Sequence, residues 1–302
     1  MVANAIDIWF GPGAQKGVFG AGVALGLQEA LESGEIDAGQ IRLYGSSVGC
    51  LTVAFLATGN AGMGLQIFQE ETRQLANLPN LLPALAARSV NGMLRVSRLS
   101  NSGLRVPNVL NLDHVFGVME KRTPEIAEQL QKSPVTAFAE TVDRSGKFRF
   151  SELRSADDPL DEIRSALNFV PFTHLPDTEG MDSAINGFGF ADLLHARERP
   201  LIVILNTGPT NGSRATMVDL TCAALSVDAR IGQLYLRRRK QRHWACQQLQ
   251  NGDPNLMLVT PPKIVRLNSP SAYQDVHRMG RQAARTIIDF VNGVDRRKAV
   301  RS

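Results

Sequence analysis

Apolar residues near the start of the chain form two short runs, and each run leads through a glycine-containing loop into a helical segment. The first run spans residues 6–10 and the second spans residues 41–44. Apolar runs of this length, bounded by glycine, are typical of buried β-strands, and strands that alternate with helices predict a parallel sheet. The N-terminal part is therefore predicted to consist of consecutive strand–helix units of an α/β fold.

The loop after the second run has the pattern G-x-S-x-G, in which Gly45, Ser47 and Gly49 lie between the strand and an apolar helix at residues 51–57. This order is the context of a nucleophile elbow, where the serine takes a strained backbone conformation and the glycines prevent clashes. The hydroxyl then lies at a helix N-terminus, where the helix dipole favours the negative charge that develops during acyl transfer. Ser47 is therefore the predicted nucleophile, and an ordinary turn of small residues is the alternative.

The loop after the first run, residues 11–17, is the predicted partner of this elbow. Gly11 and Gly17 bound it, and small residues between them let backbone N–H groups approach a substrate and form an oxyanion hole. Because neighbouring parallel strands end at the same edge of a sheet, both loops are expected to build one site. The alternative is a dinucleotide-binding fingerprint, but its glycine spacing would be one residue too long, Pro12 lies in the turn, and no acidic residue ends the second strand.

Together, the two loops resemble those of the patatin-like phospholipases, in which G-G-G-x-[RK]-G precedes G-x-S-x-G. Lys16 and Gly17 match the family's [RK]-G, which places Pro12, Gly13 and Ala14 on its three glycines. The resemblance implies that the backbone N–H groups of Gly13 and Ala14 form the oxyanion hole. Three roles stay open for Lys16: it positions its loop, contacts a phosphate head group, or lies in solvent at the start of a helix.

A downstream segment resembles the family's D-G-[GA] motif, with Asp182 in the position of the acid and Ser183 in place of the usual glycine. It follows residues 165–172, which are similar to the family's A-S-x-x-x-P-x-x-F run. The resemblance implies a Ser–Asp dyad, in which Asp182 takes the Ser47 proton without an intervening histidine. Such a carboxylate must be partly desolvated and within hydrogen-bond reach of the hydroxyl.

The five histidines do not indicate a Ser–Asp–His triad, because none lies in a late loop flanked by Gly or Asp. His277 is the only one late enough in the chain, and its place on the polar side of a helical pattern predicts a solvated helix residue. A standard α/β-hydrolase also needs several strands before its elbow. Only one strand–helix unit precedes Ser47, so that topology does not fit.

Length and composition favour a single domain. The chain has 302 residues, 43% of them apolar, and no Ser/Gly/Pro-rich break separates two globular halves. The predicted fold class is α/β, a patatin-like three-layer α/β/α arrangement with a mostly parallel central sheet. Residues 5–210 would form the catalytic core, with a helical insertion at 63–130 after the elbow, and residues 211–302 would form a helical C-terminal part of the same domain. The resemblance covers residues 5–210, including a hairpin region at 133–148 and an apolar strand at 201–205.

Two segments are candidates for lipid contact. The insertion is rich in leucine and other flexible aliphatic residues, which would form an acyl-chain channel or lid over the serine, or else pack in the core. A run of cations, Arg237, Arg238, Arg239 and Lys240, lies in a helical pattern with Trp244. Such a run suits peripheral contact with an anionic membrane, and a solvated helix face is the alternative. Nucleic-acid binding is not expected, because the sequence has no recognisable module for it.

The three cysteines, Cys50, Cys222 and Cys246, lack metal-ligand spacing and are predicted to be reduced, which suits a cytosolic protein. No metal or other cofactor is expected, because no His/Cys/Asp cluster has ligand spacing. The first residues contain neither a basic n-region nor a long apolar run, so no signal peptide or membrane-spanning helix is predicted. The expected location is cytoplasmic or peripheral to a membrane.

The sequence thus predicts a serine lipid acyl hydrolase of phospholipase A or esterase type, in which Ser47 attacks an ester of a phospholipid or other lipid and Asp182 acts as base. Two alternatives stay open. The departures from the family pattern at Pro12, Ala14 and Ser183 motivate a catalytically weak lipid-binding or interaction protein. The other alternative is an acyltransferase, in which the acyl-enzyme reacts with a thiol carrier or a second lipid instead of water.

Overall fold

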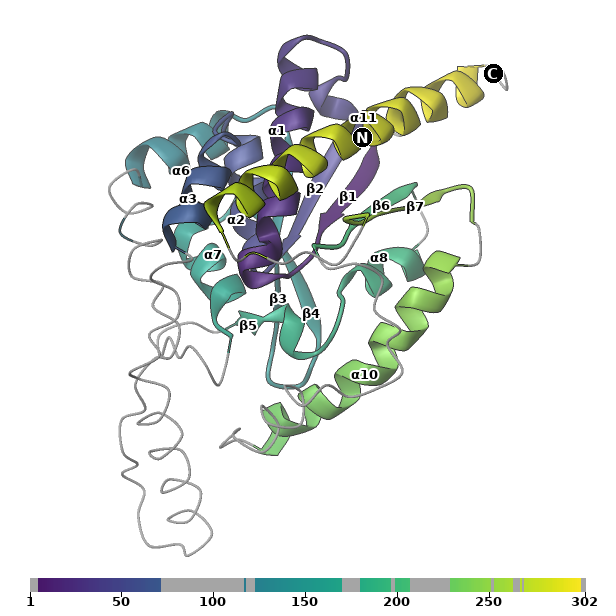
Figure 1. Ribbon diagram of the computed structural model, residues 1–302. Coiled ribbons are helices and arrows are strands. Elements are labelled where there is room, and N and C mark those ends of the chain that lie inside the picture. The colour runs from purple at the N-terminus through teal and green to yellow at the C-terminus, as the bar shows by residue number, and fades with distance from the viewer. Residues whose placement is uncertain are drawn as a thin grey trace, which may run out of the picture.

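The structure, a computed structural model, describes residues 5–71, 117, 123–169, 180–196, 199–206, 229–250, 253–262, 267 and 269–299. Its central feature is a mostly parallel β-sheet with helices on both faces (Figure 1). The chain therefore has an α/β architecture with three layers, as the pattern of apolar runs and helices predicts.

The sheet contains β1 (Ile6–Phe10), β2 (Ile41–Ser46), β3 (Thr136–Val142), β4 (Phe148–Glu152), β5 (Met181–Asp182), β6 (Leu201–Ile204) and β7 (Leu256–Val259). The parallel strands follow the order β3-β2-β1-β6-β7. Both β4 and the short β5 pair with β3 in the antiparallel sense. The strands predicted at residues 6–10, 41–44 and 201–205 are present, and β7 adds a strand to the C-terminal part, which was expected to be mostly helical.

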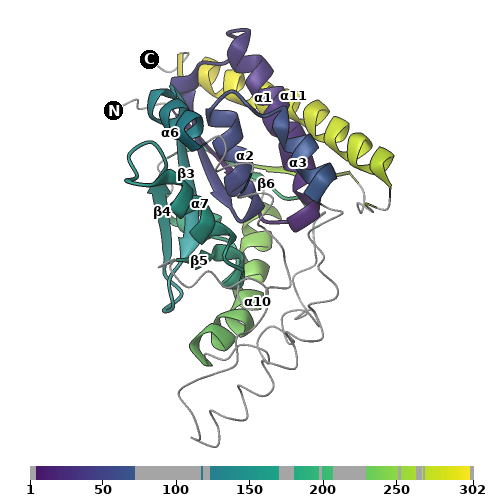
Figure 2. The same cartoon turned by 90° about the vertical axis from the view of Figure 1, so that its left-hand side faces the viewer.

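Side chains of the strands alternate between two cores, one on each face of the sheet. On β1, Ile6, Ile8 and Phe10 enter the larger core, and Trp9 enters a smaller aromatic core on the other face. The larger core is covered by α1 (Val18–Glu32), α2 (Val48–Ala57), α3 (Met63–Glu71), α6 (Thr123–Lys132), α7 (Pro159–Leu167) and α11 (Pro270–Ala299). The smaller one is covered by α8 (Phe190–Ala196) and α10 (Ala229–Gln250), on the opposite side of the sheet in Figures 1 and 2.

The last helix, α11, packs closely along the first, α1 (Figure 1). A Cβ atom at Gly22 would lie 2.0 Å from the carbonyl oxygen of His277, and one at Gly280 would lie 2.1 Å from that of Phe19, so glycine at both positions lets the backbones approach. His277 faces this contact and is only 7% exposed. The prediction of a solvated helix residue at this position is therefore wrong, because the polar side of α11 also meets α1 at this point.

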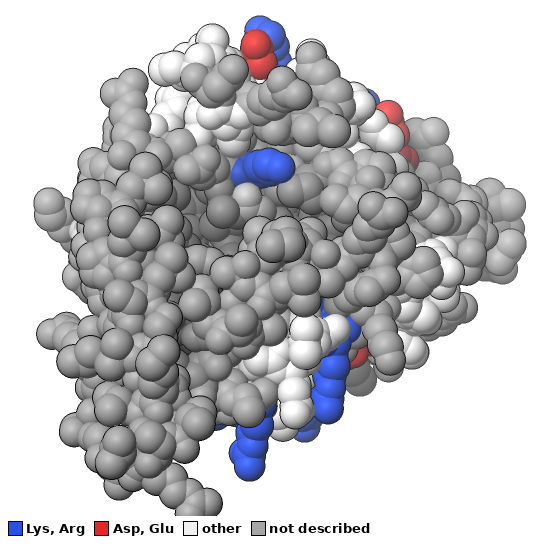
Figure 3. All heavy atoms as spheres, turned by 60° about the horizontal axis from the view of Figure 1, so that its bottom comes forward, with Lys and Arg blue, Asp and Glu red and all other residues white. Residues whose placement is uncertain are grey.

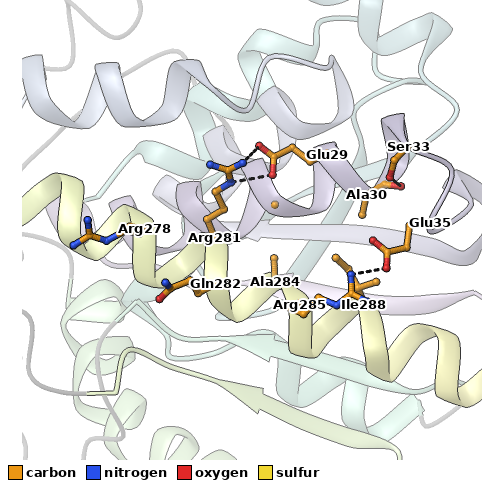
Figure 4. Close-up of a pocket in the computed structure, with 11 residues that line it drawn as sticks. Glu29, Ala30, Ser33, Glu35, Arg278, Arg281, Gln282, Ala284, Arg285 and Ile288 are labelled. Carbon is orange, nitrogen blue, oxygen red and sulfur yellow. Dashed lines mark hydrogen bonds and ion pairs between the residues drawn. The ribbon is translucent and has the colours of Figure 1, made fainter.

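A groove of about 600 Å³ runs between α1 and α11. Figure 4 shows that Arg281 reaches Glu29 and Arg285 reaches Glu35 across it. The groove follows the C-terminal half of α1, whereas the loop at residues 11–17 lies before the N-terminus of that helix. These cations are paired with carboxylates, so the groove is explained as a cross-linked helix contact.

The predicted insertion at residues 63–130 is described at its two ends, where α3 and the start of α6 are helical. Its leucine-rich middle lies outside the described residues, and the channel or lid proposed for it lies there too. In the C-terminal part, α10 and α11 are helices and β7 lies between them. Among the described helices, none combines the length and the apolar character needed to cross a membrane.

Candidate active site

Ser47 lies in a sharp turn between the end of β2 and the start of α2. Its backbone has φ 56° and ψ −129°, and no other non-glycine residue in the described parts of the chain has a positive φ. A side chain in this region costs about 1–3 kcal/mol and persists only where the surroundings fix it. Ser47 therefore has the strained conformation that the G-x-S-x-G pattern predicts, at the N-cap of α2.

The two motif glycines of the elbow are required by space. A Cβ atom on Gly49 would lie 2.2 Å from the carbonyl oxygen of Phe10, and one on Gly45 would lie 2.6 Å from the backbone nitrogen of Cys50. The lack of a Cβ on Gly49 lets α2 lie directly against the end of β1, and the lack of one on Gly45 lets β2 turn beneath α2. Any side chain at either position would push the serine out of place.

Asp182 reaches the elbow because β2 and β5 share one edge of β3, whose other edge pairs with β4. β2 pairs with β3 as far as the pair Ser46 and Glu140, and β5 then pairs with β3 at Asp182 and Thr141. β5 therefore extends the line of β2 beyond its end and brings the aspartate to the serine. The Ser47 hydroxyl donates a hydrogen bond to the Asp182 carboxylate.

The Asp182 carboxylate is buried and held in place. It is 1% exposed and accepts a hydrogen bond of 2.9 Å from the Ala184 N–H, which caps the 3-10 turn η3 (Ser183–Ile185). Burial raises the pKa of Asp182 to about 6, although the bonds from Ser47 and Ala184 and the charge of Arg238 oppose the rise. At neutral pH the group is thus ionised, and it is a stronger base than an exposed aspartate.

Arg238 belongs to the interior of the site and not to a surface patch. Leu234 and Tyr235, in the preceding turn of α10, pack on Ile185, and the Arg238 side chain is only 8% exposed. The predicted membrane-contacting run is therefore wrong at this position, because α10 turns Arg238 toward the sheet. Arg237 is exposed, and the side chains of Arg239 and Lys240 lie outside the described residues. On the face shown in Figure 3, several described Lys and Arg side chains lie near one another at the lower edge, and others lie singly elsewhere.

The upstream loop joins β1 to α1 through the 3-10 turn η1 (Ala14–Gly17). Ala14 begins this turn, whose backbone is right-handed, and the Lys16 N–H donates a hydrogen bond of 2.9 Å to the Gly13 carbonyl. The loop touches the elbow, because a Cβ atom on Gly17 would lie 2.9 Å from the Val48 side chain. The structure thus brings together the two loops, while the oxyanion role of Gly13 and Ala14 stays a prediction.

Asn206, two residues after the end of β6, ties the upstream loop to α1, and it was not identified from the sequence. Its Oδ1 accepts a bond of 2.9 Å from the Gly20 N–H, and its Nδ2 donates a bond of 2.7 Å to the Gly11 carbonyl. Its Cβ is in close contact with Gly13. The amide thus fixes both ends of the segment that carries the predicted oxyanion donors. A polar residue ending a buried strand was the signal that could have marked it.

Among the residues that the structure describes, no group of three or more His, Cys, Asp or Glu side chains could hold a metal ion. A scan of the sequence against models of protein families found no match, and a search of curated proteins found none either. Function is therefore inferred from the residues of the site.

Proposed function

We propose that this protein is a serine acyl hydrolase of patatin-like type that cleaves carboxylic esters of lipids. The observation that carries the proposal is the hydrogen bond between Ser47, in a strained elbow, and the buried carboxylate of Asp182. A hydroxyl becomes a nucleophile when a base beside it can accept its proton. The raised pKa of Asp182, about 6, makes it a base suited to this task.

In the proposed reaction, Ser47 Oγ attacks the ester carbonyl while its proton passes to Asp182. The negative charge on the carbonyl oxygen is held by the backbone N–H groups of Gly13 and Ala14. When the tetrahedral intermediate collapses, the leaving alcohol takes the proton from Asp182 and an acyl-enzyme forms. Water then attacks the acyl-enzyme, with Asp182 again accepting a proton, and releases the carboxylic acid and free Ser47.

A lipid is the proposed substrate class, through the resemblance of the loops and the aliphatic composition of residues 63–130. The exposed pair Leu236 and Arg237 on α10 would support peripheral contact with an anionic membrane, together with Arg239 and Lys240. Lys16, near the end of η1 and partly exposed, would meet a phosphate head group or hold its loop.

Acyl transfer is a second candidate, and the burial of Asp182 favours it. A carboxylate that is 1% exposed has little contact with bulk water, which would lengthen the life of an acyl-enzyme. Product analysis distinguishes the two reactions. Hydrolysis releases free fatty acid at a rate independent of added thiol or lipid alcohol, whereas transfer gives a new ester or thioester that rises with acceptor concentration.

The first test of the proposal is covalent labelling with a fluorophosphonate probe, alongside turnover of short-chain and phospholipid esters. Ser47→Ala should abolish labelling, and Asp182→Asn should lower turnover by about a hundredfold or more, because the base is lost. Ser145→Ala, an exposed hydroxyl in the β3–β4 turn, is the matched control and should label like wild type. Folded wild type that does not label, or equal labelling of Ser47→Ala, would overturn the proposal.

A further inference from the structure

A second carboxylate, that of Glu140 on β3, is buried beneath the candidate dyad. It is fully buried and accepts hydrogen bonds from the Trp9 Nε1–H, from the Gly189 N–H at 3.3 Å, and from the Ser183 hydroxyl. A buried carboxylate is costly unless such donors surround it. Each of these donors comes from a part of the chain far from Glu140 in sequence, so the position is built by the fold.

The surroundings of Glu140 fit this carboxylate closely. A Cβ atom on Gly189 would lie 2.3 Å from the carboxylate carbon, so only glycine allows the backbone to approach. Trp9 is held by edge contacts with Phe188 and Phe190, at ring distances of 5.8 Å and 5.0 Å. The donors are therefore fixed before any substrate arrives.

Two hydroxyls connect Glu140 to the dyad. Ser183 Oγ lies 2.6 Å from Ser46 Oγ. Ser46 is the residue before the nucleophile, and Ser183 is the residue after the base. Because the single Ser183 proton goes to ionised Glu140, Ser183 accepts from Ser46, and the chain runs from Ser46 through Ser183 to Glu140. These hydrogen bonds link the end of β2 to the end of β5.

We propose that Glu140 is a positioning residue for the dyad: through Ser183 and Ser46 it holds Ser47 and Asp182 in register for proton transfer, and its negative charge keeps Asp182 basic. This role rests on the proposed hydrolase function. It also gives a reason for serine at position 183, where the resembling family has glycine, since a glycine would leave Glu140 and Ser46 without their connection.

The charge of Glu140 makes the proposal testable through the pH dependence of activity. Burial, with a smaller effect of the Asp182 charge, raises the pKa of Glu140 to about 7, so it ionises above Asp182. The titratable and charged groups around the pair are Cys50 on α2, whose thiol feels both carboxylates, and Arg238 on α10, whose charge acts on Asp182. As Glu140 ionises, Asp182 becomes more basic, so activity should rise in two steps between about pH 5 and 8.

The experiment compares wild type with Glu140→Gln and Ser183→Ala, using fluorophosphonate labelling rates and ester turnover from pH 5 to 9. Glutamine keeps the size of the side chain and removes its charge. Glu140→Gln should lower kcat about tenfold with KM unchanged and should remove the upper step of the profile. Ser183→Ala should lower kcat to a similar extent but keep the two-step profile, because the charge remains. Glu128→Gln, on the exposed surface of α6, is the control and should change neither.

A structural role alone would give a different result. If Glu140→Gln lowers kcat only in proportion to a loss of folded protein and leaves both steps, or leaves kcat unchanged, the proposal is overturned. A carbon-13 NMR titration of the Asp182 carboxyl decides the coupling without turnover: in wild type its signal should show a second inflection near pH 7, where Glu140 ionises, and this inflection should be absent in Glu140→Gln, whereas an inflection that persists in the variant would refute the electrostatic role. If wild type fails to label while this second inflection is present in wild type and absent in Glu140→Gln, the hydrolase proposal fails and the coupling between the two carboxylates stands.

Discussion

The two glycine loops of the candidate site are held in place by different means. The elbow is fixed by residues within its own five positions, since the strain at Ser47 is supported by Gly45 and Gly49 packed against neighbouring backbone. The upstream loop has one hydrogen bond of its own, from the Lys16 N–H to the Gly13 carbonyl, and it is further tied down by Asn206, a residue that follows it by nearly two hundred positions. The comparison teaches that one half of the site is encoded locally, while the other is completed only by the tertiary fold.

The largest expected effect comes from breaking the local half. Gly49→Ala places a methyl group 2.2 Å from a fixed carbonyl oxygen of β1, so the elbow and the β1–α2 contact cannot both persist. Overpacking of this kind costs about 1–3 kcal/mol or more. The free energy of unfolding, measured with denaturant, should fall by that amount, and labelling of Ser47 should be lost.

Gly293→Ala is the matched control for this change. Gly293 lies in α11, and a Cβ atom there meets nothing within 4 Å, so the substitution should leave stability unchanged or raise it by up to about 1 kcal/mol. Equal losses in both variants would show that the packing around Gly49 has no special importance.

The next effect tests the distant support of the upstream loop. Asn206→Ala removes the bonds to Gly20 and Gly11 and should let the loop shift away from the position of the oxyanion. Loss of one oxyanion donor typically costs about a hundredfold or more in rate, so we expect kcat to fall by about ten- to a hundredfold, with a smaller loss of stability. Steady-state kinetics at a temperature where the variant is folded measures this fall in kcat. An unchanged kcat would mean that the loop keeps its conformation without Asn206.

The dependence on pH separates activity from stability at Asp182. Activity should fall as the pH drops through about 6, because the protonated carboxyl cannot accept the Ser47 proton. Stability should change in the opposite direction. The pKa is raised above its ordinary value of 3.8 on folding, so this contribution to stability is full below about pH 4 and is lost as the pH rises through about 6.

Asp182→Asn should remove both effects. Unfolding free energies at pH 4 and pH 7.5 should differ less in this variant than in wild type, and turnover should be low at every pH. A wild-type rate that stays constant down to pH 4 would contradict the assignment of Asp182 as the base.

The smallest effect is expected from restoring a glycine to the upstream loop. Because Ala14 lies in a 3-10 turn, whose right-handed backbone does not require glycine, Ala14→Gly should change kcat by less than about threefold. A large increase would show that the side chain at this position hinders the oxyanion hole, and would favour a catalytically weak wild-type protein.

The elbow could be predicted from sequence because all its determinants are contiguous. A strand, two glycines and a serine are enough to specify the conformation of Ser47, and the structure has it. Asp182 was identified only through the family resemblance, since an aspartate before a turn has no distinctive pattern of its own. Its position follows from the pairing of β5 with β3, which no local pattern reveals.

Glu140 and Arg238 show why the rest of the site could not be predicted. Glu140 is one charged residue within the apolar β3, and its partners Trp9, Ser183 and Gly189 are distant in sequence. Arg238 lies in a run of cations that looks like a solvent-exposed face, and only the packing of α10 on η3 shows that it turns inward. In both cases the role of the charged residue depends on the residues that surround it in the folded protein.

The contact between α1 and α11 also bears on how the protein is made. A ribosome makes α1 well before α11, so the face of α1 that carries Gly22 has no partner until β2 to β7 have been made and α11 emerges. The core that supports both loops cannot close before that moment. We therefore expect the nascent chain to hold both loops in their final positions only once α11 has been synthesised and has packed on α1.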